Sequence, residues 1–392
     1  MLNSRKDSQS LSDDLFLMRG VGILLVVVVH VLGVDAVHGV RQLVDPGRAD
    51  LRISVELIHS FNMAVMLMGS GVAVAAFGRA DLRLGEFLRK KVSKLLIPML
   101  VWAPALFAMQ ELRYGRPHGL AAWLHLLARL PTAWIPPYSI FWFMHALMGC
   151  TLLAWLFRKY AAPRLGRWSD GIYFALAMIL FLAVLSWKQA TGGGVVSEYL
   201  ETIFYWNRFF GLGMLLQPRL TAVSQAQARL PAAVQVLLPV AFFGAIALVY
   251  AVVPEAQYEH ARTINGPLGF CMLFTLAVFL RTRVSVLGAV WREAWRRLVL
   301  VGSMSMTLYL FHLYFVSSTR VALERWHAGT PLSVHLVLGT LAGCLGPWVL
   351  FQLLKGSPLF HWSIGSVAGA RKKPVTVEAP AGDLAAMPSP KM

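Results

Sequence analysis

The chain alternates long apolar runs with short polar segments, which is the pattern of a polytopic membrane protein. Ten of these runs are long enough, at about 17 residues or more, to cross a bilayer as α-helices. They cover residues 15–34, 53–77, 92–112, 138–158, 171–187, 199–216, 231–252, 264–281, 298–320 and 333–354. The sequence contains no internal repeat. We therefore predict an all-α polytopic membrane bundle of about ten transmembrane helices, with no fused soluble domain.

The segments outside the membrane runs divide the chain into three parts. Residues 1–14 form a predicted cytoplasmic N-terminal segment, residues 15–354 the membrane domain, and residues 355–392 a cytoplasmic tail. The tail is predicted to be disordered, because from Gly365 it is rich in Ala, Pro, Lys and Ser. Within the membrane domain, residues 119–130 are apolar but too short to span. We expect them to form an interfacial helix on the outer face.

Composition supports the membrane class and predicts the orientation. Of the 392 residues, 57% are hydrophobic and 14% are charged, whereas a soluble domain carries about 25% charge. The mean hydropathy is +0.61. The net charge of +17 comes mostly from Lys and Arg in short loops between spans, which argues against a nucleic-acid-binding face. With the N-terminus inside, 24 Lys and Arg lie in inner segments and ten in outer segments. The positive-inside rule therefore predicts cytoplasmic termini.

Two ionisable residues of the first apolar run lie on one helical face. Arg19 and His30 are the only ionisable groups in residues 15–33, and they are 11 residues apart. Eleven steps of an α-helix come within about 20° of three whole turns, so the two side chains share a face about 16 Å apart along the axis. Ionisable groups inside a membrane are costly and usually face a polar cavity. The pair predicts a site that extends from a basic group near the inner surface to an imidazole deep in the membrane.

Polar residues of other runs are predicted to lie at the depth of His30. Counting helix rise from the predicted span ends places polar side chains of four helices in the outer half of the bilayer: His30, His59, Asn62, His145 and His312. Ser70 lies on the helical stripe of Asn62, and Tyr309 is three residues before His312. As alternatives, His145 or His312 is a hydrogen-bonding residue between helices, and His59 is an interfacial residue. Arg208 is either a structural partner of Glu201 or a ligand-binding group.

A basic run follows the second span. It comprises Arg89, Lys90, Lys91 and Lys94, directly before the apolar residues 95–100. One interpretation is a membrane flank that binds anionic headgroups. The other is a binding site for a polyanionic ligand at the cytoplasmic face, and the two interpretations are compatible.

Five segments carry a family resemblance. They read MRGVGILLVVVVH, SFNMAVMLMGSG, FLRKKVSKLLIP, FWFMHAL and MTLYLFHLYFV, and span the sequence from Arg19 to His312. In this order they resemble the acyltransferase-3 family of integral-membrane O-acyltransferases, which has an Arg-x10-His spacing, a Ser-Gly motif, a basic run before its third span and a late Tyr-Leu-x-His segment. The chain is most similar to the subgroup of fucose 4-O-acetylase-like proteins, although Asn62 stands where that subgroup often has histidine.

The resemblance implies an enzyme that transfers a short acyl group, acetyl or similar, from cytoplasmic acyl-CoA to a hydroxyl of an extracytoplasmic glycan or other carbohydrate. His30 would be the catalytic base or would briefly hold the acyl group. The residues that would bind the donor are Arg19, Arg89, Lys90, Lys91 and Lys94. Those that would form or support the acceptor site are Asn62, Ser70, His145, Tyr309 and His312.

The same resemblance sets the expected partners. Acyl-CoA, with acetyl-CoA as the expected form, is a co-substrate, and we expect no bound cofactor and no metal. The other partners are the carbohydrate acceptor and the lipid bilayer, here a bacterial inner (plasma) membrane, with no nucleic acid; the oligomeric state stays open. The alternative is a transporter or flippase for a polar lipid-linked sugar, in which the histidines would relay protons.

Overall fold

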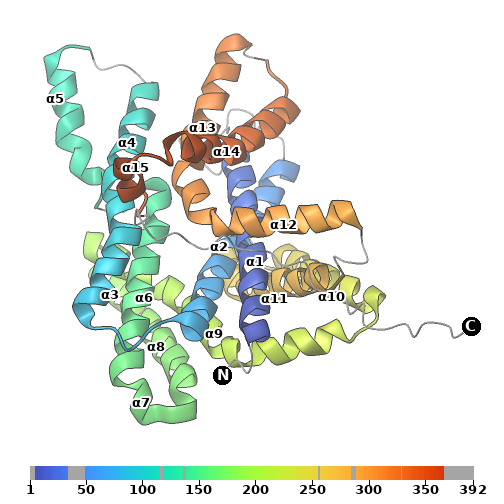
Figure 1. The fold of residues 1–392 in the computed structure, drawn as a ribbon. Helices are drawn as coiled ribbons and strands as arrows, with labels where there is room; N and C mark the ends of the chain where they lie inside the picture. Colours follow the sequence, from blue (N-terminus) through green and yellow to red (C-terminus); the bar gives the residue numbers. More distant parts are fainter. Residues whose placement is uncertain are drawn as a thin grey trace, which may run out of the picture.

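The protein is a bundle of α-helices (Figure 1). The computed structural model describes residues 5–33, 49–114, 118–135, 138–254, 257–283, 288–327 and 329–365, and contains no strand among them. Its helices are α1 (Arg5–Leu32), α2 (Ala49–Phe77), α3 (Leu84–Lys91), the π-helical turn η2 (Val92–Leu96), α4 (Ile97–Tyr114), α5 (Leu120–Arg129), α6 (Trp142–Tyr160), α7 (Ala162–Leu165), α8 (Ser169–Thr191), α9 (Val195–Ala228), α10 (Ala232–Val252), α11 (Tyr258–Arg283), α12 (Ala289–Ser303), α13 (Ser305–Trp326), α14 (Leu332–Leu354) and α15 (Pro358–Ser363). Short 3-10 turns are η3 (Leu130–Ala133), η4 (Ser139–Phe141) and η5 (Gly166–Trp168).

Within the described residues, eight helices are long and apolar enough to cross a membrane, or nine if the bent pair α12–α13 counts as one span. The prediction of a membrane helix bundle is confirmed, whereas the count of about ten is not. The two predicted spans that account for the difference are 298–320 and 199–216. Each departs from the prediction for its own physical reason.

The predicted span 298–320 is broken. Its first residues belong to α12, which ends at Ser303, and α13 starts at Ser305 after a bend of 84°. The break falls in the sequence Gly302-Ser303-Met304-Ser305, and Gly and Ser are typical of sharp helix kinks. The Ser303 hydroxyl donates to the Leu300 carbonyl at 2.7 Å, which competes with continued helix formation. Apolar length alone therefore predicted one span where the chain forms two helices.

The helix α12 crosses α1 at very close range (Figure 1). A Cβ built on Gly20 would lie 2.3 Å from the Leu298 carbonyl oxygen, and one on Gly302 would overlap the Phe16 carbonyl. Only glycine allows two backbones to approach this closely. The contact fixes the break of α12–α13 beside Gly20, one residue beyond Arg19.

The predicted span 199–216 lies in α9. This helix is too polar to count as a membrane span by its composition. Its charged residues have partners inside the protein. Glu201 pairs with Lys188 of α8 at 2.6 Å, and the Arg208 guanidinium lies 4.1 Å from the Tyr205 ring centroid in a cage of three aromatic rings. Arg208 is therefore not the structural partner of Glu201. A helix that is enclosed by other helices can carry charged groups, because its side chains contact protein and not lipid. A hydropathy scale measures how well a segment suits lipid, so it does not identify such a helix as a span.

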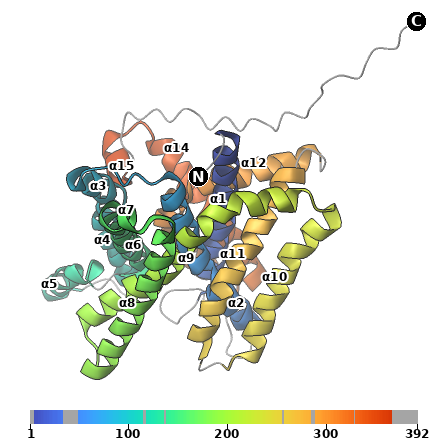
Figure 2. The same ribbon diagram turned by 90° about the horizontal axis from the view of Figure 1, so that it is seen from below.

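The bundle is organised around α1 and α2 (Figure 2). Helix α1 contacts α2, α11, α12, α13 and α14, while α2 packs against α9 and α11. At the N-terminal end of α1, the Arg281 guanidinium of α11 forms an ion pair with Asp14 at 2.7 Å and donates to the Ser224 hydroxyl of α9. Asp14 is only 2% exposed. This buried pair ties the ends of α1, α9 and α11 together.

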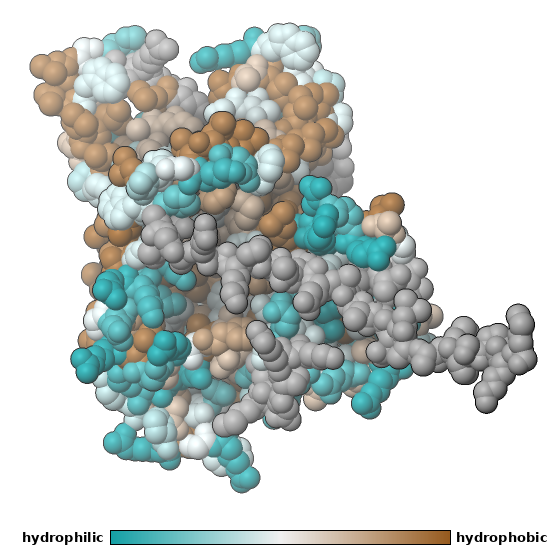
Figure 3. Space-filling view, viewed as in Figure 1, coloured by the Kyte–Doolittle hydropathy of each residue, from teal (hydrophilic) through white to brown (hydrophobic). Residues whose placement is uncertain are grey.

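The surface separates apolar from charged faces (Figure 3). Apolar side chains cover the part that contains α4 and α5, while hydrophilic side chains gather over α3 and α12. In α5 the exposed large side chains include Leu120, Leu124 and Leu127. The predicted short helix at 119–130 is therefore present, and its interfacial location stays a prediction.

The predicted disordered tail 355–392 begins with a folded segment. Residues 358–363 form α15, and the Phe360 side chain is 6% exposed and part of the main apolar core. The prediction of disorder is wrong for this segment, because contacts with distant helices stabilise a helix too short to form alone. Residues 366–392 of the tail and 1–4 of the N-terminal segment lie outside the described residues.

Candidate active site

Two of the predicted site histidines meet inside the bundle. His30 of α1 and His312 of α13 have ring centroids 5.0 Å apart, with the ring planes at 75°. His312 is fully buried and His30 is half-buried. The two residues are 282 positions apart in the chain, and they meet because α1 and α13 pack side by side.

Backbone contacts determine which nitrogen of each ring can act as a base. The His30 Nδ1 lies 3.0 Å from the Val26 carbonyl oxygen, and the His312 Nδ1 lies 2.8 Å from that of Tyr309. A carbonyl oxygen only accepts, so in each neutral ring Nδ1 carries the proton and Nε2 the lone pair. The His312 Nε2 is buried and has no hydrogen-bond partner. In the neutral form of both rings the lone pair is therefore on Nε2, the atom that general-base chemistry would use.

A third histidine is on the part of α2 that packs against the His30 end of α1. His59 of α2 is near enough to interact electrostatically with His30, with Glu56 and with Arg262 of α11. Glu56 accepts a hydrogen bond from the Tyr250 hydroxyl of α10 at 2.5 Å. Sequence reasoning left His59 open and missed Glu56, Tyr250 and Arg262. Their only sequence signal is a position near a predicted span end, which is common for residues of no special role.

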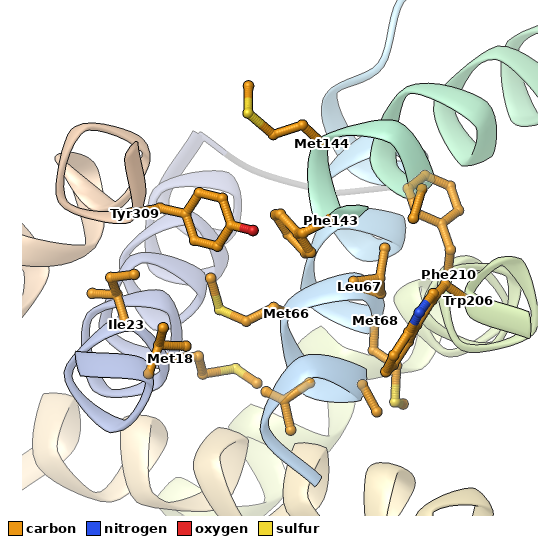
Figure 4. Close-up of a cluster of buried hydrophobic side chains, with 14 of the residues drawn as sticks. Met18, Ile23, Met66, Leu67, Met68, Phe143, Met144, Trp206, Phe210 and Tyr309 are labelled. Atoms are coloured by element: carbon orange, nitrogen blue, oxygen red, sulfur yellow. The ribbon is translucent and has the colours of Figure 1, made fainter. Parts of the chain in front are cut away.

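Tyr309 lies beside the histidine pair, with its ring centroid 6.0 Å from that of His312, whereas His145 contacts α9 instead. The Tyr309 hydroxyl donates to the Ile140 carbonyl, and its ring packs against Phe143, 5.2 Å between centroids (Figure 4). His145 bonds the Phe141 carbonyl through Nδ1 and packs edge-on against Tyr199 of α9. Tyr309 therefore links α13 to η4 and α6, and His145 packs its ring against α9. The hydrogen bond of His145 stays within its own segment and does not join two helices. The site roles predicted for both residues stay predictions.

Asn62 is buried and Ser70 is half-buried on α2, both at other levels than His30. The Asn62 amide donates to the Gly22 carbonyl at 3.1 Å, while its Oδ1 is buried without a partner. Gly22 is eight residues before His30, or about 12 Å along α1. Asn62 therefore lies between the levels of Arg19 and His30, and not beside His30 as depth counting predicted. The Ser70 hydroxyl donates to the Met66 carbonyl of its own helix.

Arg19 is a half-buried cation for which the described residues supply no counter-charge. It makes no hydrogen bond or ion pair with any other residue that the structure describes. A guanidinium in this position is costly unless an anion pairs with it. Arg19 is therefore available to bind an anionic or strongly polar group of a ligand.

The predicted basic run forms one wall of a cavity. Lys90, Lys91 and Lys94 line a space of about 170 Å³ together with Arg79 and Arg158. Arg79 forms an ion pair with Asp81, and the hydrogen bond between them lowers the pKa of the Asp81 carboxyl. The positive charge of Arg79 is therefore already partly balanced. Arg89 does not line this cavity, and its predicted role in donor binding stays a prediction. Arg158, which α6 contributes from 68 residues after Lys90, was missed because nothing near it in the sequence marks it.

The floor of this cavity is aromatic. The Phe87 and Trp155 rings stack with centroids 4.8 Å apart, and the Lys91 ammonium lies 5.6 Å from the Phe87 ring centroid. The Trp155 Nε1 is buried and has no partner, although Trp155 lines the cavity. Arg158 donates to the Val74 and Ala75 carbonyls at the end of α2. The cavity thus combines cations, an unused N–H donor and an apolar floor.

The cavity and the histidine pair lie toward opposite ends of α2. Val74 lines the cavity. His59, 15 residues earlier and about 22 Å away along the helix, is on the part of α2 that packs against the His30 end of α1. No group of three or more His, Cys, Asp or Glu in the described chain is arranged to hold a metal ion. The arrangement suits a ligand with a polyanionic end and a reactive end joined by a long arm.

Residues 13–352 match the sequence model of a known family, described as an acyltransferase domain (Acyl_transf_3). The chain belongs to the acyltransferase-3 family. No curated protein and no solved structure gave a significant match. Membership of this family makes the protein a membrane acyltransferase and disfavours the transporter alternative. The fucose 4-O-acetylase-like subgroup stays a prediction.

Proposed function

We propose that this acyltransferase transfers a short acyl group, acetyl or similar, from cytoplasmic acyl-CoA to a hydroxyl of an extracytoplasmic carbohydrate. The observation that carries the proposal is the placement of a cation-lined cavity and a histidine pair toward opposite ends of α2. CoA has phosphates at one end and a thioester at the end of a long thin arm. A ligand of this shape could occupy both sites at once.

The donor phosphates would bind in the cavity. Lys90, Lys91 and Lys94 line it, and ammonium groups bind phosphates as point charges. The unpartnered Trp155 N–H would donate to a phosphate or amide oxygen, which removes the cost of a buried unused donor. Arg19 and the Asn62 Oδ1 would contact the arm, because both lie along α1 and α2 between the levels of the cavity and His30.

The chemical step would take place at His30. Its Nε2 removes the proton of the acceptor hydroxyl as the oxygen attacks the thioester carbonyl carbon. The C–S bond then breaks, the acyl group remains on the acceptor oxygen, and the proton leaves with the CoA thiolate to give the free thiol. The equally balanced alternative transfers the acyl group first to His30 and then to the acceptor. In both, the edge contact with His312 holds the His30 ring in place.

The proposed membrane is a bacterial inner membrane, with the chain termini on the cytoplasmic side. The bias of 24 inner to ten outer Lys and Arg supports this orientation. With this orientation the basic cavity would lie on the inner side and the histidines toward the outer side. Donor and acceptor would therefore meet from opposite sides of the membrane.

Sealed vesicles of known orientation test the proposal. Acyl-CoA labelled in the acyl group is supplied on the cytoplasmic face only, and a carbohydrate acceptor on the opposite face. We expect labelled acceptor and stoichiometric free CoA thiol. Product that forms only when both substrates share the cytoplasmic face would contradict the transfer across the membrane, and absence of thiol release under all conditions would contradict the use of acyl-CoA.

Replacing Arg19 tests the donor path. Arg19→Ala should raise the KM for acyl-CoA about tenfold or more, because a partly desolvated charge–ligand contact is lost. Arg19→Lys should recover only part of this, since a point charge replaces a planar fork. The two KM values, for donor and acceptor, are measured separately. A change in the acceptor KM alone would show that Arg19 faces the other substrate.

A further inference from the structure

The short helix α15 contacts the turn that carries the donor-binding lysines. Gly365, just after α15, has a φ of +66°, and a Cβ built there would lie 2.2 Å from the Ser93 carbonyl oxygen and 2.7 Å from the Lys94 Cα. The Trp102 Nε1 of α4 donates to the Ser363 carbonyl at 3.2 Å. The end of α15 is thus fixed directly against η2 and α4.

The backbone of this turn needs an external support. In η2 the Ile97 N–H bonds the Val92 carbonyl five residues back, and Pro98 has no N–H. The Ser93 carbonyl therefore has neither of the donors that a helix normally offers it. Gly365 packs onto this carbonyl, where a Cα–H contact is the interaction available. The π-helical turn is held from outside by a residue that is 272 positions away in the sequence.

The other side of α15 faces the helix of His312. The Phe360 ring stacks on the ring of Phe311, 6.0 Å between centroids, and Phe311 precedes His312 on α13. Trp102 also contacts the Phe311 ring edge-on, at 4.7 Å. Helix α15 therefore lies between the turn of Lys94 and α13, the helix that carries His312.

We infer that the segment from Pro358 to Gly365 is a positioning element of the active site, which holds the Ser93–Lys94 turn in the geometry that binds the donor. The segment lies beyond residues 13–352, which the family model covers. The functional part of the inference rests on the proposed donor site, whereas the contact of Gly365 with the turn does not. The glycine is needed because any Cβ at this position must displace the Ser93 carbonyl or the Lys94 backbone.

Three single substitutions in the full-length chain separate the possible causes. Gly365→Ala adds both the Cβ overlap and strain at positive φ, while Gly365→Asn adds the overlap at a φ that asparagine tolerates. Gly356→Ala is the matched control, because a Cβ there meets no neighbour within 4 Å. Hydrogen exchange of residues 90–98 reports the turn, and steady-state kinetics report the donor and acceptor KM.

Both Gly365 variants should show faster exchange at 90–98 and a donor KM raised about fivefold, with the acceptor KM and kcat unchanged. The Gly356 variant should match the wild type. Unchanged exchange, or changed exchange with an unchanged donor KM in an enzyme that uses acyl-CoA, would overturn the inference. If Gly365→Asn behaves as the wild type, backbone strain and not the contact is responsible, which also overturns it. If the wild-type protein does not use acyl-CoA but both Gly365 variants show faster exchange at 90–98, the proposed function is refuted. The role of Gly365 in supporting the turn would still be established.

Discussion

Replacing His30 with alanine is expected to reduce kcat/KM for acyl transfer by at least 100-fold, and by up to about 10,000-fold. The reason is that His30 presents its Nε2 lone pair beside His312, with Nδ1 held by the Val26 carbonyl. Binding of acyl-CoA should be retained, since the cavity that would hold the phosphates lies toward the other end of α2, about 22 Å along that helix from His59. Purified protein in nanodiscs allows turnover and donor binding to be measured on one sample.

A histidine outside the proposed site provides the control for this substitution. His335 of α14 is 3% exposed and so more enclosed than the half-buried His30, and His335→Gln removes an imidazole that has no proposed role. Its turnover should stay within about threefold of the wild type. Near-normal turnover of His30→Ala, or an equal loss in both variants, would remove the catalytic assignment of His30.

Reversing two charges of the basic cavity should have the second large effect. The double variant Lys91→Glu and Lys94→Glu is expected to raise the KM for acyl-CoA about 100-fold, because two attractive contacts with the phosphates become repulsive. At saturating donor, kcat should change little. The wild-type KM should itself rise with salt, since exposed charge contacts are screened.

The control for charge reversal is a second double variant, which reverses two charges outside the cavity. Arg164→Glu with Arg167→Glu alters the segment of α7 and η5, which does not line the cavity. It should leave the donor KM within about threefold of the wild type. If both double variants raise the KM equally, the effect comes from the general field of the surface, and the cavity is not the donor site.

The predictions from the sequence succeeded where one local rule is sufficient. Arg19 and His30 share a face because helix periodicity places them there, whatever surrounds the helix. The basic run at 89–94 was recognised from charge alone, and three of its lysines line one cavity. Arg89 points elsewhere, because a helix turns its successive side chains to different sides.

The predictions failed where a contact between distant segments decides the result. Counting depth from the span ends placed Asn62 at the level of His30. The hydrogen bond from Asn62 to the Gly22 carbonyl instead puts Asn62 about 12 Å away from the level of His30 along α1. Arg158 joins the cavity only because α6 packs beside α2 and α3. Nothing within a few residues of Asn62 or Arg158 could have revealed these neighbours.

The sequence by itself determined the membrane class, nearly all of the helices, the family and the Arg19–His30 face. The bilayer requires long apolar helices, and helix geometry then orders their side chains, so these properties are local. Only the tertiary structure decided that His30 meets His312, that α12 breaks from α13 and crosses α1, and that α15 supports the Lys94 turn. These features depend on the packing of segments far apart in the chain, where close approach at Gly20, Gly302 and Gly365 selects the arrangement.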